Sequence, residues 1–243
     1  MAVAVVGINP RSAVTFEQSL AQSWLRRVEA KGFVFTEGDP ATHVYQVETG
    51  AVALYKVFTD GRRQIVGFAY PGDFIGLGVH GEYPMYAQAI KPTRLRCLPV
   101  AALHQFAARD PLIGFKLYEA LAGELATTRE LVFTKGRRGA MQRVVSFLLA
   151  FSRRNGENGH DSPCVDLPMT RTDIGDFLSL SVETVSRTFT NLRMRGLIEL
   201  PCTNLVKLVD IEQLQSIADG EEGALWTKPM SLGGLPCRRP RRG

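Results

Sequence analysis

Residues 168–209 read PMTRTDIGDFLSLSVETVSRTFTNLRMRGLIELPCTNLVKLV, and the first part of this stretch has the pattern of a short amphipathic helix. Either Thr170 or Thr172 can cap this helix, because a threonine hydroxyl accepts a hydrogen bond from a free backbone N–H of the first turn. The expected inward residues are Ile174, Phe177 and Leu178. Gly175 has no side chain, so it would allow a second helix to cross closely.

A second helix is predicted after the short SLS turn. Ser181 can cap it, and its buried side at i, i+4 and i+7 consists of Val185, Phe189 and Leu192. Gly196 ends this helix, and residues 197–200 and 205–209 fit two strands on either side of a turn at 201–204. The order of elements predicts a winged helix-turn-helix, whose second helix lies in the major groove of DNA.

The outward face of the second helix carries polar groups that suit DNA bases. It presents Glu183, Ser186, Arg187, Thr190, Arg193 and Arg195. The arginine fork matches O6 and N7 of guanine, and a carboxylate accepts a hydrogen bond from N4 of cytosine. The alternative is that Glu183 and Arg187, four residues apart, form only a surface pair. We assign DNA binding to Thr170, Arg171, Ser181, Glu183, Thr184, Ser186 and Arg187.

Residues 32–81 contain nine glycines, with short stretches between them such as HVYQVE, AVALYKVF and RQIVGFAY. These stretches are typical of strands, and turns about every 10 residues indicate a sandwich or rolled barrel. Asp60-Gly61 predicts a hairpin with a two-residue type I′ turn, which needs positive φ at both central residues. Thr49-Gly50 predicts a further turn.

The segment 112–136 carries apolar residues three and four positions apart and predicts a long helix. Its apolar residues cover more than one face, so the helix must bury a second side. We expect that side to be a dimer seam; the alternative is a helix buried in the core of one chain. The seam residues are Leu117, Leu121, Leu125 and Ala126. Lys135-Gly136 is expected to end the helix, and residues 137–154 predict a second amphipathic helix.

The composition is that of a globular protein, with 45% hydrophobic and 22% charged residues among 243. No stretch approaches the roughly 18 apolar residues of a membrane span, and residues 1–10 lack a basic leader, so we expect a cytoplasmic protein. The net charge of +5 favours an anionic partner only mildly, because residues 137–220 carry no net charge. Four scattered cysteines without a CxxC motif predict reduced thiols.

Three features together resemble the CRP/FNR superfamily of bacterial transcription regulators: the glycine-punctuated segment through PGDFIG, the long helix before RRGAMQRVVSFLLAFSRR, and TRTDIGDFLSLSVETVSR. The resemblance covers roughly residues 25–215. The residues Glu183, Ser186 and Arg187 are similar to those of the FNR and FixK branches, whereas the cyclic AMP receptor branch has glycine in place of Ser186. Ser179 departs from the glycine that the family's turn often has, which implies slight strain.

The resemblance also implies which effectors fit the roll. Met85 and Tyr86 stand where the cyclic AMP binders have an Arg-Ser pair, and Arg129 replaces a serine of the long helix, so cyclic AMP is not expected. No cysteine precedes Cys97, so a four-cysteine iron-sulfur cluster is not expected either. We expect no cofactor. The alternative is a haem-dependent gas sensor, with ligands among His43, His80, His104 and Cys97.

Cys202 lies in the expected wing turn. We expect an exposed cysteine without a role. The alternative is a redox switch, because oxidation of a thiol close to DNA phosphates would add negative charge and bulk. The tail ends in CRRPRRG, whose arginines would add nonspecific attraction to phosphates.

These features predict an α+β chain with an N-terminal β-roll of the cyclic-nucleotide-binding, jelly-roll type, a long dimerisation helix and a C-terminal winged helix-turn-helix. The expected parts are an N-terminal segment (1–24), the β-roll (25–110), the dimerisation helix (111–136), the DNA-binding domain (137–220) and a basic, disordered tail (221–243).

The predicted function is that of a homodimeric transcription regulator, an activator that binds double-stranded DNA and touches RNA polymerase. Its resemblance implies a TTGAT-N4-ATCAA-like palindrome and genes for low-oxygen or nitrogen-oxide respiration. A small enzyme with an appended DNA-binding domain is the alternative from another class. No Ser-His-Asp, HExxH, Walker or GxGxxG pattern supports it.

Overall fold

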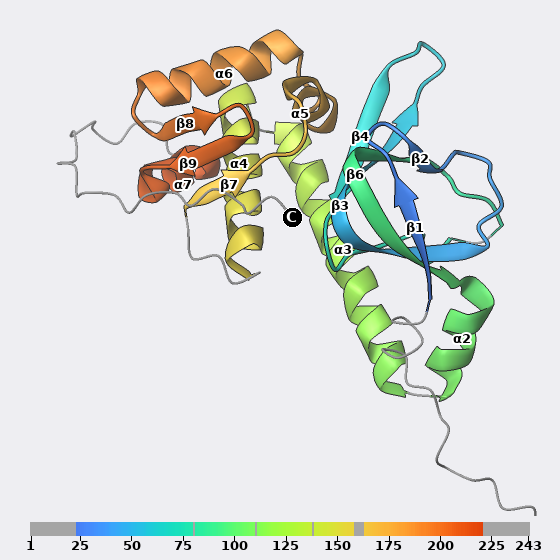
Figure 1. Cartoon of the computed structure of the whole chain (residues 1–243). Helices are drawn as coiled ribbons and strands as arrows, with labels where there is room; N and C mark the ends of the chain where they lie inside the picture. Colours follow the sequence, from blue (N-terminus) through green and yellow to red (C-terminus); the bar gives the residue numbers. More distant parts are fainter. Residues whose placement is uncertain (1–22, 80, 110, 138, 158–162, 221–243) are drawn as a thin grey trace, which may run out of the picture. The chain divides into compact units, whose positions relative to one another are not determined.

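The computed structural model describes residues 23–79, 81–109, 111–137, 139–157 and 163–220. The chain divides into two compact units, one made of residues 1–54 and 68–124 and the other of residues 55–67 and 125–243. The predicted fold class is confirmed: a β-roll is followed by a long helix and a helix-turn-helix with a wing (Figure 1). Most of the N-terminal segment, His80 and the basic tail lie outside the described residues.

The first unit is built around the β-roll. Its strands are β1 (Trp24–Val28), β2 (Phe33–Phe35), β3 (His43–Val57), β4 (Arg63–Ala69), β5 (Phe74–Ile75) and β6 (Tyr86–Pro99). They form one sheet in the order β1-β6-β3-β4, in which β2 also pairs with β6 and β5 with β3. The side chains of Val47, Val52 and Leu95 are buried in its core. The ends of β3 and β4 beside their shared loop, residues 55–67, belong to the second unit.

The β3–β4 hairpin is present, but its turn is not the two-residue type I′ turn that was predicted. Gly61 has a φ of 80°, whereas Asp60 has no positive φ. The N–H of Gly61 donates to the carbonyl of Phe58, and the N–H of Phe58 donates to the carbonyl of Arg62, both at 2.9 Å. A single left-handed glycine therefore closes a longer loop. The Asp60 carboxylate accepts from the N–H of Arg62 at 3.0 Å and supports this conformation.

The turn predicted at Thr49-Gly50 is wrong, because β3 runs through it as one strand of 15 residues. Gly50 has a φ of 101°, and a Cβ there would lie 2.4 Å from Oγ1 of Thr93. This glycine serves a close approach between β3 and β6 rather than a reversal of the chain.

Two helices follow the roll. Helix α2 (Val100–Arg109), which the sequence pattern did not reveal, comes before α3 (Pro111–Arg137). Helix α3 matches the predicted long helix, but it continues through Lys135-Gly136 instead of ending there. A single glycine costs a helix only about 1 kcal/mol, so it does not have to break one.

The second unit holds the helix-turn-helix. Its elements are α4 (Ala140–Glu157), β7 (Cys164–Asp166), α5 (Arg171–Leu178), α6 (Val182–Met194), β8 (Ile198–Cys202), β9 (Leu205–Leu208) and α7 (Ile211–Asp219). Helix α4 packs against α6 and α7, and the three strands pair in the order β7-β9-β8. The sequence pattern revealed neither β7 nor α7. Strands β8 and β9 form the predicted wing, with Cys202 paired to Leu205 so that only Thr203 and Asn204 make the turn.

Of the cysteines that the structure describes, Cys97 and Cys202 are free, whereas Cys164 is disulfide-bonded. The expectation of reduced thiols is therefore wrong for Cys164. None of the helices within the described residues is long and apolar enough to cross a membrane.

Candidate nucleic-acid interface

Helix α5 begins at a complete capping box. Oγ1 of Thr170 accepts a hydrogen bond from the N–H of Asp173 at 3.1 Å, and Oδ2 of Asp173 accepts one from the N–H of Thr170 at 2.9 Å. Of the two threonines considered, Thr170 is thus the cap. The predicted inward residues Ile174 and Leu178 are buried, and Phe177 is half-buried with its ring 5.7 Å from that of Phe147.

The turn after α5 depends on two residues. A Cβ on Gly175 would lie 2.6 Å from the carbonyl oxygen of Leu180, so only glycine lets the chain pass this close. The close neighbour is the turn itself rather than a crossing helix. Ser179 has left-handed angles, φ 56° and ψ 50°, and its N–H donates to the carbonyl of Gly175. This agrees with the slight strain expected of a serine where glycine is common.

Helix α6 begins with the predicted cap. Oγ of Ser181 accepts from the N–H of Thr184 at 3.2 Å, and the two hydroxyls are 3.0 Å apart. The three predicted buried residues, Val185, Phe189 and Leu192, are at most 2% exposed. Because this side of α6 is fixed in the core, the opposite side must face outward (Figure 1).

The exposed side of α6 brings three of the predicted DNA-binding residues together. Glu183, Ser186 and Arg187 are all exposed, and Ser186 and Arg187 line a shallow hollow together with Thr190, Asn191 and Met194. The sequence reasoning did not include Asn191 and Met194. Asn191 lies one turn and Met194 two turns beyond Arg187 on the same face, and this spacing was the available signal.

The alternative that Glu183 and Arg187 merely pair with each other has little support in the geometry. A hydrogen bond from its own backbone N–H, then one with Ser181, and then the charge of Arg187 lower the pKa of the Glu183 carboxyl. The described structure contains no direct ion pair between the two side chains. The guanidinium of Arg187 is therefore available to a ligand.

The other predicted DNA-binding residues have roles inside the protein. Thr170 and Ser181 cap helices, and the half-buried Thr184 bonds to Ser181. The guanidinium carbon of Arg171 lies 3.6 Å from the centroid of the Phe189 ring, and burial lowers the pKa of Arg171. Arg171 thus packs α5 onto α6, and its contact with DNA stays a prediction.

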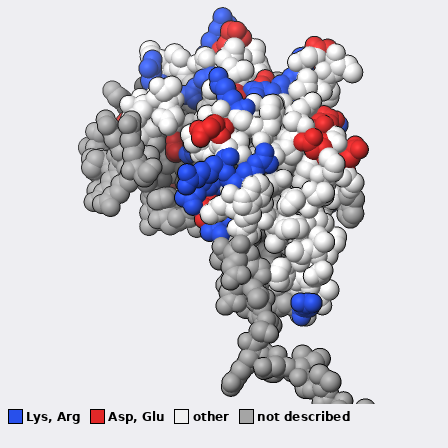
Figure 2. All heavy atoms as spheres, turned by 45° about the vertical axis from the view of Figure 1, so that its right-hand side comes forward, with Lys and Arg blue, Asp and Glu red and all other residues white. Residues whose placement is uncertain are grey.

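Charged side chains of both signs lie near one another on the face of the molecule drawn in Figure 2. On the face drawn in Figure 2, Lys and Arg atoms form separate groups with Asp and Glu atoms between them. Residues 137–220 carry no net charge. Recognition of an anionic partner must depend on where individual cations such as Arg187 lie.

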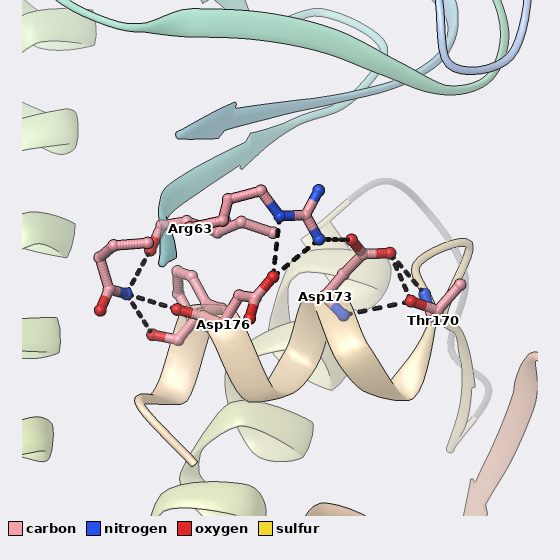
Figure 3. Close-up of polar contacts among 7 residues, drawn as sticks. Arg63, Thr170, Asp173 and Asp176 are labelled. Atoms are coloured by element: carbon pink, nitrogen blue, oxygen red, sulfur yellow. Dashed lines mark hydrogen bonds and ion pairs between the residues drawn. The ribbon is translucent and has the colours of Figure 1, made fainter. Parts of the chain in front are cut away.

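Two more residues of this unit contact the helix-turn-helix and were not anticipated. Arg63 and Gln64, from the end of the β3–β4 hairpin, bond to side chains and carbonyls of α5 (Figure 3). No sequence signal links them, because more than 100 positions separate the partners.

Comparison with known proteins agrees with this geometry. Residues 142–217 match the model of a Crp-like helix-turn-helix domain, and residues 25–110 match that of a cyclic nucleotide-binding domain. The nitrogen fixation regulation protein FixK of Bradyrhizobium diazoefficiens is 38% identical over 185 residues, which are 76% of this chain and 78% of that protein. The chain belongs to the CRP/FNR family, in its FixK/FNR branch.

Other members of the CRP/FNR family match over a similar length. The transcriptional activatory protein AadR of Rhodopseudomonas palustris is 34% identical over 79% of this chain and 80% of its own. The solved structure of FixK2 from Bradyrhizobium japonicum superposes with a TM-score of 0.75, at 35% identity, and covers 80% of this chain and 96% of that one. The chain is accordingly a transcription regulator with a DNA-binding helix-turn-helix.

Met85 and Tyr86, which stand where cyclic AMP binders have an Arg-Ser pair, supply no positive charge to a cyclic phosphate. Met85 and Tyr86 are half-buried at the start of β6, with the Tyr86 ring 6.1 Å from that of Phe33. An apolar side chain and a phenol provide no guanidinium fork. These residues do not fit cyclic AMP.

The candidate haem ligands are divided in the structure. His43 and Cys97 line one hollow of about 400 Å³ in the first unit, whereas His104 is exposed elsewhere on α2. Burial raises the pKa of the Cys97 thiol, and His43 hydrogen-bonds through Nδ1 to Oγ1 of Thr42 at 2.9 Å. The described residues contain no group of three or more His, Cys, Asp or Glu that could hold a metal ion.

The four predicted seam residues do not share one environment. Leu117 is half-buried against the cluster of Val44, Leu98 and Leu103 of its own unit. Leu121 and Leu125 are 40% and 50% exposed, and Ala126 is exposed as well. Elsewhere on the helix, Leu112, Phe115, Tyr118 and Val132 are exposed too. The helix therefore leaves an apolar surface uncovered in the single chain.

Proposed function

We propose that this chain acts as a homodimer that binds a palindromic DNA operator and regulates transcription from it, without enzymatic activity. The observation that carries the proposal is that one side of α6 is buried in the protein while the other side is exposed. Its buried side and its cap fix the helix, while Ser186 and Arg187 remain exposed on the opposite side. A helix held this way presents its side chains at a defined angle to a groove.

The three exposed residues suit the half-site TTGAT and its inverted repeat ATCAA. Arg187 can donate two hydrogen bonds to O6 and N7 of the guanine, and Glu183 can accept from N4 of the cytosine paired with it. Ser186 can discriminate at the neighbouring positions. A two-fold dimer places two such helices in successive major grooves about 34 Å apart, which requires a palindrome.

The operator is tested by fluorescence anisotropy with a labelled duplex that carries TTGAT-N4-ATCAA. We expect binding at least about 1,000-fold tighter than to scrambled DNA of the same composition. Insertion of about five base pairs between the half-sites turns one of them to the opposite face of the helix, so affinity should fall to that of a single half-site. Equal affinity for the operator, the spaced operator and scrambled DNA would refute the proposal.

Dimerisation is proposed through the exposed apolar side of α3. Monomeric proteins seldom expose so many large apolar side chains on one helix, and a leucine- and alanine-rich face can pack as a two-helix seam. Leu125→Glu should give monomers in sedimentation velocity with weakened operator binding. The control is Leu117→Ala, which trims a side chain that packs within its own chain. Dimers that survive both Leu125→Glu and Leu121→Glu would exclude this seam.

The proposed biological role follows from the relatives. They include a nitrogen fixation regulation protein and transcriptional activator proteins, so we propose an activator that touches RNA polymerase and serves low-oxygen or nitrogen-oxide respiration in the cytoplasm. Mapping of binding sites across the host genome, with and without oxygen, tests it. Sites upstream of respiratory genes support it, and sites unrelated to them contradict it.

We propose further that operator binding needs neither cyclic AMP nor another cofactor. The half-buried Met85 and Tyr86 give a cyclic phosphate no positive partner. Calorimetric titration should show no cyclic AMP binding at micromolar concentration. The shared hollow of His43 and Cys97 favours haem as the second candidate, and an absorbance spectrum of protein purified from haem-supplemented cells separates the two. A Soret band would contradict the cofactor-free proposal.

Cys202 is proposed as a redox-sensitive position in the wing. It is an exposed free thiol at the end of β8, whereas Cys97 is buried with a raised pKa caused by that burial. Peroxide should lower DNA affinity, and Cys202→Ser should resist the effect while Cys97→Ser does not. Equal sensitivity of the wild type and Cys202→Ser would exclude the switch.

A further inference from the structure

The end of the β3–β4 hairpin holds a guanidinium between two carboxylates of α5. Nε of Arg63 donates to Oδ2 of Asp176 at 2.8 Å, and Nη2 donates to Oδ1 of Asp173 at 2.5 Å (Figure 3). The three side chains are 27%, 26% and 14% exposed for Arg63, Asp176 and Asp173, so water screens them only in part. Burial alone would lower the pKa of Arg63, but its bonds to both carboxylates raise it.

Asp173 connects this ion pair to the start of α5. Its Oδ2 accepts hydrogen bonds from the N–H of Thr170 at 2.9 Å and from the Thr170 hydroxyl at 2.7 Å, while its Oδ1 faces Arg63. One carboxylate therefore caps the helix and binds the hairpin at the same time. Arg63 fixes the rotamer that the capping box requires.

Gln64 acts at the other end of α5. The last carbonyls of a helix have no partner within it, and Nε2 of Gln64 donates to the carbonyl of Asp176 at 2.5 Å. Its Oε1 accepts from the hydroxyl of Ser179 at 3.0 Å. The carbonyl of Leu178 is taken by Nη1 of Arg143 at 3.2 Å. The hairpin thus contacts the first turn, the last turn and the residue that reverses the chain toward α6.

A residue of the β3–β4 hairpin itself also orients the Arg63 guanidinium. The Arg63 guanidinium carbon lies 5.2 Å from the centroid of the Tyr55 ring, which belongs to the same hairpin. A cation held by an aromatic ring loses less freedom when it meets its carboxylates. Asp60, by contrast, bonds the neighbouring Arg62, which is 81% exposed and engaged only within the hairpin loop.

We propose that Arg63 and Gln64 are positioning residues for DNA reading. Together with Asp173 and Asp176 they form a hairpin clamp that fixes α5 at both ends, and α5 fixes α6 through the tight turn and the Arg171–Phe189 contact. The Arg63 guanidinium also offsets part of the negative charge of two carboxylates on the helix that crosses the DNA backbone in this motif, so that they repel phosphates less. The proposal rests on the proposed operator binding.

The first test is a comparison of Arg63→Met and Arg62→Met in operator binding. Methionine keeps the apolar stem and removes the charge and the donors. We expect Arg63→Met to lose about tenfold in operator affinity and Arg62→Met less than about twofold. Arg63→Lys should recover only part of the loss, because an ammonium cannot bridge both carboxylates as the fork does. Equal losses for Arg63→Met and Arg62→Met would overturn the clamp.

A double-mutant cycle with Asp176→Asn separates the clamp from a direct DNA contact. If Arg63 acts through Asp176, the loss caused by Arg63→Met should shrink severalfold in the Asp176→Asn background. If Arg63 instead touches a phosphate, its loss should be the same in both backgrounds and on scrambled DNA, with the salt dependence reduced by about one ion. That second pattern would refute the proposal.

A measurement without DNA keeps the clamp testable if the operator proposal fails. Hydrogen exchange should show faster opening of the α5 amides in Arg63→Met, by about tenfold, with the amides of α7 unchanged. Unchanged α5 exchange would refute the clamp whatever the DNA data show. Wild-type protein that binds no operator, with α5 loosened by Arg63→Met, would refute only the operator proposal.

Discussion

Helices α5 and α6 are neighbours in one motif, but their charged side chains differ in their partners. Those of α5 contact other residues of the protein, whereas the arginines on the exposed side of α6 do not form ion pairs within the described part of the chain. On α5, Asp173 and Asp176 bond Arg63, and Arg171 lies over the Phe189 ring. On α6, Arg187 and Arg193 are exposed and make no ion pair with any other residue that the structure describes. The charged side chains of α5 thus make contacts within the protein, whereas Arg187 and Arg193 of α6 can contact a ligand.

The difference shows that one motif separates two tasks. A helix that positions another helix needs hydrogen bonds and ion pairs to the rest of its unit. A helix that reads DNA needs one face whose side chains are exposed and not bonded within the protein. Substitutions on α5 should therefore change stability and placement, whereas those on the exposed side of α6 should change DNA binding, and those at Glu183, Ser186 and Arg187 should change affinity for particular bases.

The largest effect is expected at Gly175. A Cβ there would lie 2.6 Å from the carbonyl oxygen of Leu180, so Gly175→Ala must displace the backbone of the turn. We expect a loss of about 3 kcal/mol in the free energy of unfolding. Urea unfolding measures it. The control is Gly114→Ala, where the nearest atom is 3.8 Å from a new Cβ and a gain of up to about 1 kcal/mol is expected.

A substitution at Arg171 tests whether this residue packs α5 onto α6 or contacts DNA. Arg171→Met should lower the free energy of unfolding by about 1 kcal/mol through loss of the cation–π contact with Phe189. Arg193→Met, on the exposed side of α6, should leave unfolding unchanged and weaken binding to all DNA sequences alike. If Arg171→Met behaves like Arg193→Met, Arg171 is a phosphate contact and not a packing residue.

A smaller effect is expected at Ser179. Ser179→Gly removes the left-handed strain of a residue with φ 56° but adds freedom to the unfolded chain and loses the hydroxyl bond to Gln64. These effects nearly cancel, so we expect unfolding free energy to change by less than about 0.5 kcal/mol. Thermal and urea unfolding both measure it. A loss of unfolding free energy three times larger than this limit would show that the hydroxyl bond to Gln64 outweighs the strain at Ser179.

The smallest effect is the pH dependence of Glu183. Its pKa is lowered from the ordinary 4.5 by its own backbone N–H, Ser181 and Arg187, so the ionised form stabilises the folded state. The contribution is present above the unfolded-state pKa and is lost as pH falls through the folded-state pKa. The stability difference between wild type and Glu183→Gln should therefore be constant near neutral pH and shrink as the pH falls below the ordinary value of 4.5. A difference that grows on acidification would contradict this sign.

Local features of the motif could be predicted from the sequence. Ser181 caps α6, and Val185, Phe189 and Leu192 are buried, because capping and helical spacing act within a few residues. Two predictions at single glycines were wrong because a glycine can serve more than one local role. Gly136 was taken as a helix end, but a glycine in a helix costs little, and Gly50 was taken as a turn although it serves a close contact with Thr93.

Partners far apart in the sequence could not be predicted. Arg63 and Asp176 are 113 positions apart, and neither residue type nor spacing links them. Strand β7 has only three residues and exists through its pairing with β9, so no periodicity reveals it. Arg171 was assigned to DNA by its place in the motif, and only the structure shows the Phe189 ring beneath it.

Helix α6 is proposed to read bases through Arg187. The most direct test is Arg187→Ala measured against a set of operators altered one base pair at a time. We expect a loss of about 2 kcal/mol on the intact operator, near zero on the operator without the half-site guanine, and unchanged salt-sensitive binding to scrambled DNA. Asp176→Asn, on the helix that only positions, should lose the same factor on every operator. If Arg187→Ala loses an equal factor on every sequence, including scrambled DNA, Arg187 contacts the DNA backbone and does not read bases.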